Sequence, residues 1–67
     1  MERKRVISST IRSVGYDADL SVLEIQFTSG SVYRYHRVPL NVYEGLMKAA
    51  SKGSYFNSRI KDRYNFR

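Results

Sequence analysis

The spacing of apolar residues changes once along the chain. In the first half, apolar and polar side chains alternate, as they do in half-buried strands, and the alternation predicts strands over residues 9–16, 20–27 and 32–37. After Pro39, apolar residues recur every three or four positions, which indicates two helices. We therefore expect an α+β fold, in which a three-stranded antiparallel meander precedes two helices (β-β-β-α-α) and a helix packs on one sheet face.

The hairpin between the second and third strands has two candidate registers. A two-residue turn at Ser29 and Gly30 would set Tyr33 and Tyr35 opposite polar residues and expose both rings. A three-residue turn with Gly30 in the left-handed conformation makes one face apolar throughout and leaves Arg34 on the other face. Its pairs are Phe27 with Ser31, Ile25 with Tyr33 and Leu23 with Tyr35. We prefer this register, which makes the two tyrosines core residues.

The helix boundaries follow from four residues. Pro39 suits the first turn of a helix, where its missing N–H costs nothing. The first helix is expected to end after Lys52, with Gly53 as its left-handed C-terminal residue. Ser54 would then cap the second helix. The apolar stripe of that helix consists of Phe56, Ile60 and Tyr64.

Length and composition favour one small cytoplasmic domain. With 67 residues the chain forms a single domain over residues 1–67, of which about 6–64 are expected to be ordered and the two ends to fray. It contains no cysteine, so disulfides and thiol chemistry are excluded. Its apolar stretches are far shorter than the roughly 20 residues that span a bilayer. We therefore expect no membrane partner.

The positive charge lies entirely in the second half of the chain. Residues 1–33 hold four basic and four acidic residues, whereas residues 34–67 hold eight basic and two acidic ones, which accounts for the whole net charge of +6. A charge confined to one half can form a one-sided positive surface of the kind that binds a phosphate backbone. Basic residues that serve only solubility would give the same excess of positive charge, so a solubility role stays open as the alternative.

The sequence offers no constellation for catalysis. His36 is the only histidine, and the acidic residues fall in different predicted elements, so neither a nucleophile with its base nor three convergent metal ligands can be assembled. Asp17 and Asp19 bracket the first turn and are expected to stabilise it through backbone hydrogen bonds. We predict a protein that is not an enzyme and that uses no cofactor and no metal.

The candidate binding residues are cations and neighbouring aromatic rings. Tyr33 and Tyr35 would be available for base stacking only in the register that exposes them. Tyr55 lies off the apolar stripe of the second helix, so we expect it to be exposed beside cations. The predicted nucleic-acid-binding residues are Arg34, His36, Arg37, Lys52, Tyr55, Arg59, Lys61 and Arg63.

Four segments in a fixed order carry a family resemblance. They are SSTIRSVGYD, the Y-x-Y of Tyr33-Arg34-Tyr35 within VYRYHRVPLNVYEGLMKA, the VP pair inside that segment, and SKGSYFNSRIKDRY. From about Val6 to Tyr64 the chain resembles the KTSC domain, a unit found at the C-terminus of some lysyl-tRNA synthetases and as a free-standing bacterial or phage protein. The family has no established activity, and the resemblance implies RNA binding only through the synthetase neighbour.

Two functions are consistent with these features. The leading hypothesis is a small non-catalytic module that binds nucleic acid, RNA in preference to DNA, through a basic surface. The second is a protein–protein interaction module or small homodimer that docks another chain on an exposed strand edge or helix face. The chain is expected to be a monomer or a weak homodimer.

Overall fold

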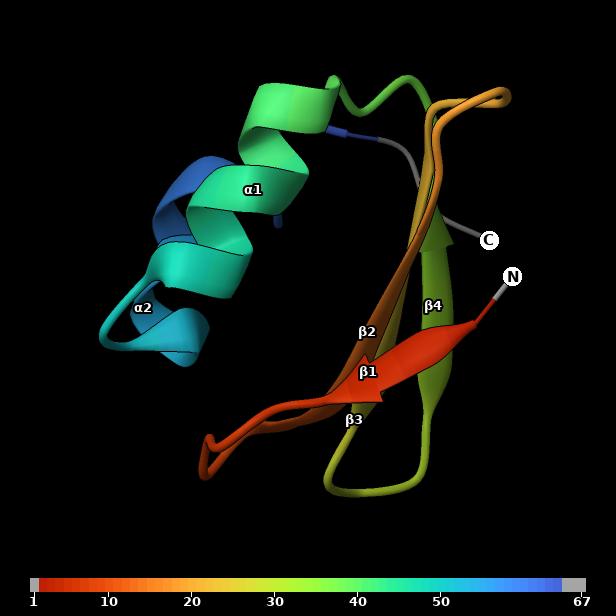
Figure 1. Cartoon of the computed structure of the whole chain (residues 1–67). Coiled ribbons are helices and arrows are strands. Elements are labelled where there is room, and N and C mark those ends of the chain that lie inside the picture. The colour runs from red at the N-terminus through yellow and green to blue at the C-terminus, as the bar shows by residue number, and fades with distance from the viewer. Residues whose placement is uncertain (1, 65–67) are drawn as a thin grey trace.

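The computed structural model describes residues 2–64 and shows an α+β fold with one antiparallel sheet and two helices. The strands are β1 (Arg3–Arg5), β2 (Ile11–Asp17), β3 (Val22–Phe27) and β4 (Val32–Tyr35), and the helices are α1 (Leu40–Lys48) and α2 (Lys52–Arg59). The sheet order is β1-β2-β3-β4, and both helices lie on the same face of the sheet (Figure 1). We call this the inner face and the opposite one the outer face.

The prediction of three strands is wrong, because the structure has four. The first residues of the chain, which were expected to fray, form β1 and pair with β2 through Arg3 with Gly15 and Arg5 with Ser13. A short run of cations is well suited to an edge strand, since its backbone pairs on one side while the charged side chains stay in water. The fraying expected for residues 65–67 lies outside the described residues.

The preferred hairpin register is confirmed. Gly30 has a φ of +99°, and the amide of Phe27 donates to the carbonyl oxygen of Ser31 at 2.8 Å. Ile25 pairs with Tyr33 and Leu23 with Tyr35, as the three-residue turn requires. Tyr35 is consequently a core residue that is 3% exposed, whereas Tyr33 is 36% exposed at the rim of the sheet.

The boundary between the helices is wrong in the sequence prediction. α1 ends at Lys48, and Ser51 rather than Ser54 caps α2, since the Ser51 hydroxyl accepts a hydrogen bond from the amide of Ser54 at 3.3 Å. Gly53 is not a left-handed stop but lies in the first turn of α2. There it faces the β1–β2 loop, where a Cβ on Gly53 would come within 3.3 Å of Thr10 Oγ1.

The core fills the space between the inner face and the two helices. The predicted stripe of Phe56, Ile60 and Tyr64 is confirmed as apolar packing but not as one helix face, because α2 ends at Arg59. Phe56 and Ile60 are buried, and the half-buried Tyr64 packs against the core. Tyr16 anchors the segment before α1, donating from its hydroxyl to the carbonyl oxygen of Val38 at 2.6 Å. The other buried hydrophobic residues of this core are Ile11, Val14, Leu23, Ile25, Tyr35, Val38 and Leu46.

Candidate nucleic-acid interface

The predicted cations lie in several parts of the molecule. Arg34 belongs to β4 and sits on the outer face, since its neighbours Tyr33 and Tyr35 face inward. Arg37 follows β4 in a turn, where its φ of +60° ends the strand. Lys52 is at the start of α2, roughly 10 Å along the helix axis from Arg59 at its end. These cations therefore come from β4, from the turn that follows it and from both ends of α2.

Arg34 takes part in an ion-pair network on the outer face. Its Nε lies 2.7 Å from one carboxylate oxygen of Glu24, and Nη1 of Arg3 lies 3.2 Å from the other. Glu24 is only 7% exposed, so the two cations largely enclose its charge. One of the two positive charges is neutralised by this carboxylate. Arg34 is thus less available to a phosphate than its position between two tyrosines predicted.

Three of the predicted cations lie close together at the end of α2. Arg59 is the last helical residue, and Lys61 and Arg63 follow within the next turn. All three are exposed, and Asp62 is the only acidic residue between them. No ion pair is formed by these cations among the residues that the structure describes. We call Arg59, Lys61 and Arg63 the α2-end cluster.

An aromatic groove lies beside this cluster. It has a volume of about 290 Å³ and is lined by Phe27, Tyr33, Tyr35, Phe56, Lys61 and Asp62. Phe27 packs edge to face against both Tyr33 and Phe56, with ring centroids 5.6 and 5.2 Å apart. Tyr33 is the most exposed of these rings, while burial, with a smaller contribution from Tyr33, raises the pKa of Tyr35. The groove thus brings together residues from the hairpin and from the end of α2.

The sequence predicted Tyr33, Tyr35 and Lys61 as candidate binding residues, but the prediction missed Phe27, Phe56 and Asp62. Phe27 and Phe56 were expected to be core residues, which is correct for Phe56. Asp62 is a single acid among cations, and nothing in the sequence marks it as a binding residue. The hairpin register is the feature of the sequence that could have indicated the groove. It pairs Phe27 with Ser31, and Tyr33 follows Ser31 by two residues on the same face, which brings the two rings close together.

Tyr55 serves mainly to pack the two helices together. Its hydroxyl lies against Gly45 of α1, where any Cβ would overlap it, and its ring is half-buried. The expectation that Tyr55 is exposed is therefore wrong, although the guanidinium of Arg59 does lie over its ring at 6.0 Å from the centroid. This contact positions one member of the α2-end cluster.

His36 is half-buried just beyond β4. Its Nε2 atom is buried and has no hydrogen-bond partner among the described residues. In this conformation Nε2 is not accessible to a phosphate or a base. Alternation predicted an exposed outer-face position for His36, but the strand ends at Tyr35 and the chain turns at Arg37.

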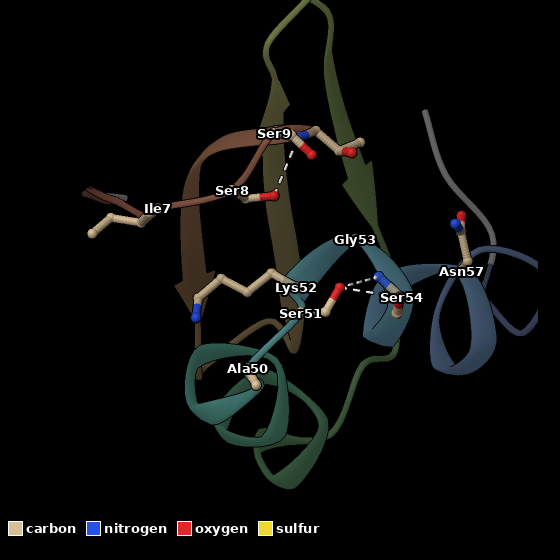
Figure 2. A pocket seen from close by; sticks show the side chains of 10 residues that line it. Ile7, Ser8, Ser9, Ala50, Ser51, Lys52, Gly53, Ser54 and Asn57 are labelled. Carbon is tan, nitrogen blue, oxygen red and sulfur yellow. Dashed lines mark hydrogen bonds between the residues drawn. The ribbon is translucent and has the colours of Figure 1, made fainter.

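A second hollow lies between the β1–β2 loop and the start of α2 (Figure 2). It has a volume of about 410 Å³ and is rich in hydroxyl groups. Those groups mainly stabilise the chain itself, since Ser8 Oγ accepts from the amides of Thr10 and Ile11, and Ser51 Oγ accepts from that of Ser54. Lys52 donates from Nζ to the carbonyl oxygen of Ala49 at 3.0 Å and points away from Ser54. We therefore place the candidate interface at the α2-end cluster instead.

Among residues 2–64, no three His, Cys, Asp or Glu side chains are grouped so that they could hold a metal ion. Neither of the two helices that the structure describes is long and apolar enough to span a bilayer.

The chain is similar to known proteins over nearly its whole length. The family model of the KTSC domain matches residues 7–64. An uncharacterized protein of Stutzerimonas stutzeri is 42% identical over 64 residues, which cover 96% of this chain and 90% of that protein. A lysine–tRNA ligase of Nostoc punctiforme is 45% identical over 58 residues, which cover 87% of this chain but only 10% of the ligase.

A solved structure has the same fold. The crystal structure of a KTSC domain protein from Yersinia pestis superimposes with a TM-score of 0.96 at 42% sequence identity, covering 98% of this chain and 93% of that one. The family match, the relatives and this structure agree with the resemblance inferred from the four sequence segments. The chain belongs to the KTSC domain family.

Proposed function

We propose that this protein is a small non-catalytic RNA-binding module, active in the cytoplasm, that contacts phosphates through the α2-end cluster. The observation that carries the proposal is the grouping of Arg59, Lys61 and Arg63 within five residues, all exposed and with a single acid between them. Exposed cations that form no ion pair among the described residues can neutralise phosphates and release the cations condensed on the nucleic acid, which is the main source of affinity in nonspecific nucleic-acid binding.

Relatives support RNA as the ligand in preference to DNA. A stretch similar to this chain occurs in lysine–tRNA ligases of Nostoc punctiforme and Trichormus variabilis, at 45% and 43% identity. The name of those enzymes states that a tRNA is joined to lysine. The chain covers only 10% of their length, so their activity belongs to the ligases, and what we carry over is the class of ligand alone.

The test is a titration of the ¹⁵N-labelled protein with a short mixed-sequence RNA, read by amide chemical shifts. We expect shifts around Arg59 to Tyr64, and an affinity that falls with salt. The logarithm of the binding constant should fall against that of the salt concentration with a slope of about −0.7 for each phosphate neutralised. A slope near zero, or shifts spread over the whole chain, would contradict the proposal.

A homodimer is the second candidate function, and the β4 edge favours it. β4 is the last strand of the described sheet and carries Val32, which is 40% exposed, beside Tyr33. β1, at the other edge, is protected by three consecutive cations. Pairing of β4 with β4 of a second copy would predict a molecular mass that doubles between micromolar and millimolar protein, measured by light scattering.

A further inference from the structure

The aromatic groove has the size and lining of a site for one planar ring. At about 290 Å³ it lies just below the range of about 300–1,000 Å³ that holds drug-sized ligands. Four of its six lining residues are aromatic. A single heteroaromatic base fits such a groove better than a large cofactor does, because it is small and presents a flat face.

The ring of Tyr33 is held in position before any ligand arrives. It packs edge to face on Phe27 at an interplanar angle of 64°, and Phe27 packs in the same way on Phe56 at 72°. The buried ring of Tyr35 also contacts Phe56, at 5.7 Å between centroids. A base that stacks on Tyr33 would therefore order few side chains, which reduces the entropic cost of binding.

The polar surroundings of the groove match a nucleotide chain. The amides of Ile60 and Lys61 both donate to the carbonyl oxygen of Phe56, at 3.0 and 2.9 Å, which holds Lys61 beside the aromatic wall. Lys61 supplies a positive charge for a phosphate. Asp62 only accepts hydrogen bonds when ionised, so it suits the N–H groups of a base edge and disfavours a phosphate at its own position.

A third hollow adjoins the aromatic groove. It has a volume of about 270 Å³ and shares Phe27 and Tyr33 with the groove. Its other lining residues are Thr10, Thr28, Ser29 and Ser31, whose hydroxyl groups suit a ribose or phosphate. A strand of RNA passing Tyr33 would thus meet hydroxyl groups on one side and Lys61 on the other.

We infer that the aromatic groove binds one unpaired base of an RNA strand, stacked on Tyr33, with a neighbouring phosphate at Lys61. The inference rests on the proposed function and deepens it, because it makes the module selective for single-stranded over double-stranded RNA. Bases buried in a duplex cannot reach the groove, whereas unpaired bases can be splayed out onto aromatic side chains.

The test compares two hexanucleotides, uridine hexamer and a hexamer of abasic ribose phosphates, which carry the same phosphates. The protein is tested as wild type and as Tyr33→Phe, which keeps a stacking ring, and Tyr33→Thr, which keeps strand propensity without a ring. Val32→Thr is the matched control, since it lies in the same strand with its side chain on the other face. Circular dichroism and thermal unfolding check that every variant is folded.

We expect the wild type, Tyr33→Phe and Val32→Thr to bind the uridine hexamer about tenfold more tightly than the abasic hexamer. Tyr33→Thr should lose most of that preference while keeping the same salt slope. Uridine H5 and H6 protons should shift upfield on binding, as ring stacking requires.

Equal affinity of the wild type for the two hexamers would overturn the base site and leave the phosphate interface intact. Absence of binding to either hexamer at low salt would overturn the proposed function as well. Concentration-dependent shifts of Phe27, Tyr33 and Lys61 with no RNA present would show that a second copy of the chain occupies the groove, which also contradicts the inference.

Discussion

The guanidinium of Arg3 lies 3.2 Å from the carboxylate of Glu24, although β2 runs between the two strands that carry them. The residue of β2 in the same cross-strand row is Gly15, which has no side chain to separate them. Arg34, on the next strand, binds the other oxygen of the same carboxylate at 2.7 Å. One buried carboxylate therefore links the two edge strands across the outer face of the sheet.

Replacing Glu24 with glutamine should destabilise the fold by about 1–3 kcal/mol, because two guanidinium groups lose their charged acceptor. Urea denaturation measures the change. Asp62→Asn is the matched control, since Asp62 is exposed and makes no ion pair among the described residues, and it should change stability by less than about 0.5 kcal/mol. Equal effects of the two substitutions would mean that the network contributes nothing to stability.

Gly45→Ala should destabilise the protein by about 1–3 kcal/mol, because the new methyl group would overlap the hydroxyl of Tyr55. At a helix position with free space, replacing glycine with alanine stabilises the protein by about 1 kcal/mol. A loss of stability at Gly45 would therefore indicate the overlap with Tyr55. The cost should shrink in a Tyr55→Phe background, where that hydroxyl is absent. Thermal unfolding of the four proteins measures both effects, and a cost that is unchanged by Tyr55→Phe would refute the contact.

Ser51→Ala should cost about 1 kcal/mol of stability, since its hydroxyl caps α2. Ser54→Ala should cost clearly less, because the Ser54 hydroxyl only accepts a hydrogen bond from the Ser51 hydroxyl. The Ser58 hydroxyl donates to the backbone carbonyl oxygen of Ser54, which alanine keeps. Denaturant unfolding of the two variants compares these costs. The reverse order would support a second helix that starts after Ser54.

The buried Tyr35 should make the fold sensitive to alkali. Burial raises the pKa of Tyr35 above its ordinary value of 10.0, so the folded state favours the neutral phenol. Its contribution to stability is fully present below pH 10 and is lost as the pH rises through the higher folded pKa. Tyr35→Phe should flatten this fall in stability, and denaturation measured from pH 9 to 12 checks it. Parallel curves for the two proteins would show that Tyr35 is not responsible.

The sequence was sufficient for the hairpin but not for β1. Gly30 and the alternation from Leu23 to Phe27 specify one register locally, and the structure has it. β1 consists of three cations with no apolar pattern, and it forms because β2 offers a free edge and Arg3 can reach Glu24 over Gly15. That interaction depends on residues far apart in the sequence.

The candidate site was only partly predictable for a similar reason. The division of charge between the sequence halves did not predict which cations lie together, because Arg34 is bound to Glu24 and Lys52 lies at the far end of α2 from Arg59. Gly53 resembles a helix stop in sequence but lies inside α2, where the helix approaches Thr10 closely. The grouping of Lys61 with Tyr33 arises only when the end of α2 packs beside the hairpin.

The most direct test of RNA binding through the α2-end cluster is the salt dependence of affinity for a single-stranded RNA in two variants of equal net charge. One variant carries Arg59→Gln, Lys61→Gln and Arg63→Gln, and the other carries Lys4→Gln, Arg12→Gln and Lys48→Gln, which are exposed positions elsewhere. Fluorescence anisotropy at several salt concentrations gives each slope. We predict that the first variant loses about 2 units of slope and the second keeps the wild-type slope. Equal losses in both variants would show that only net charge matters and would contradict a localised interface.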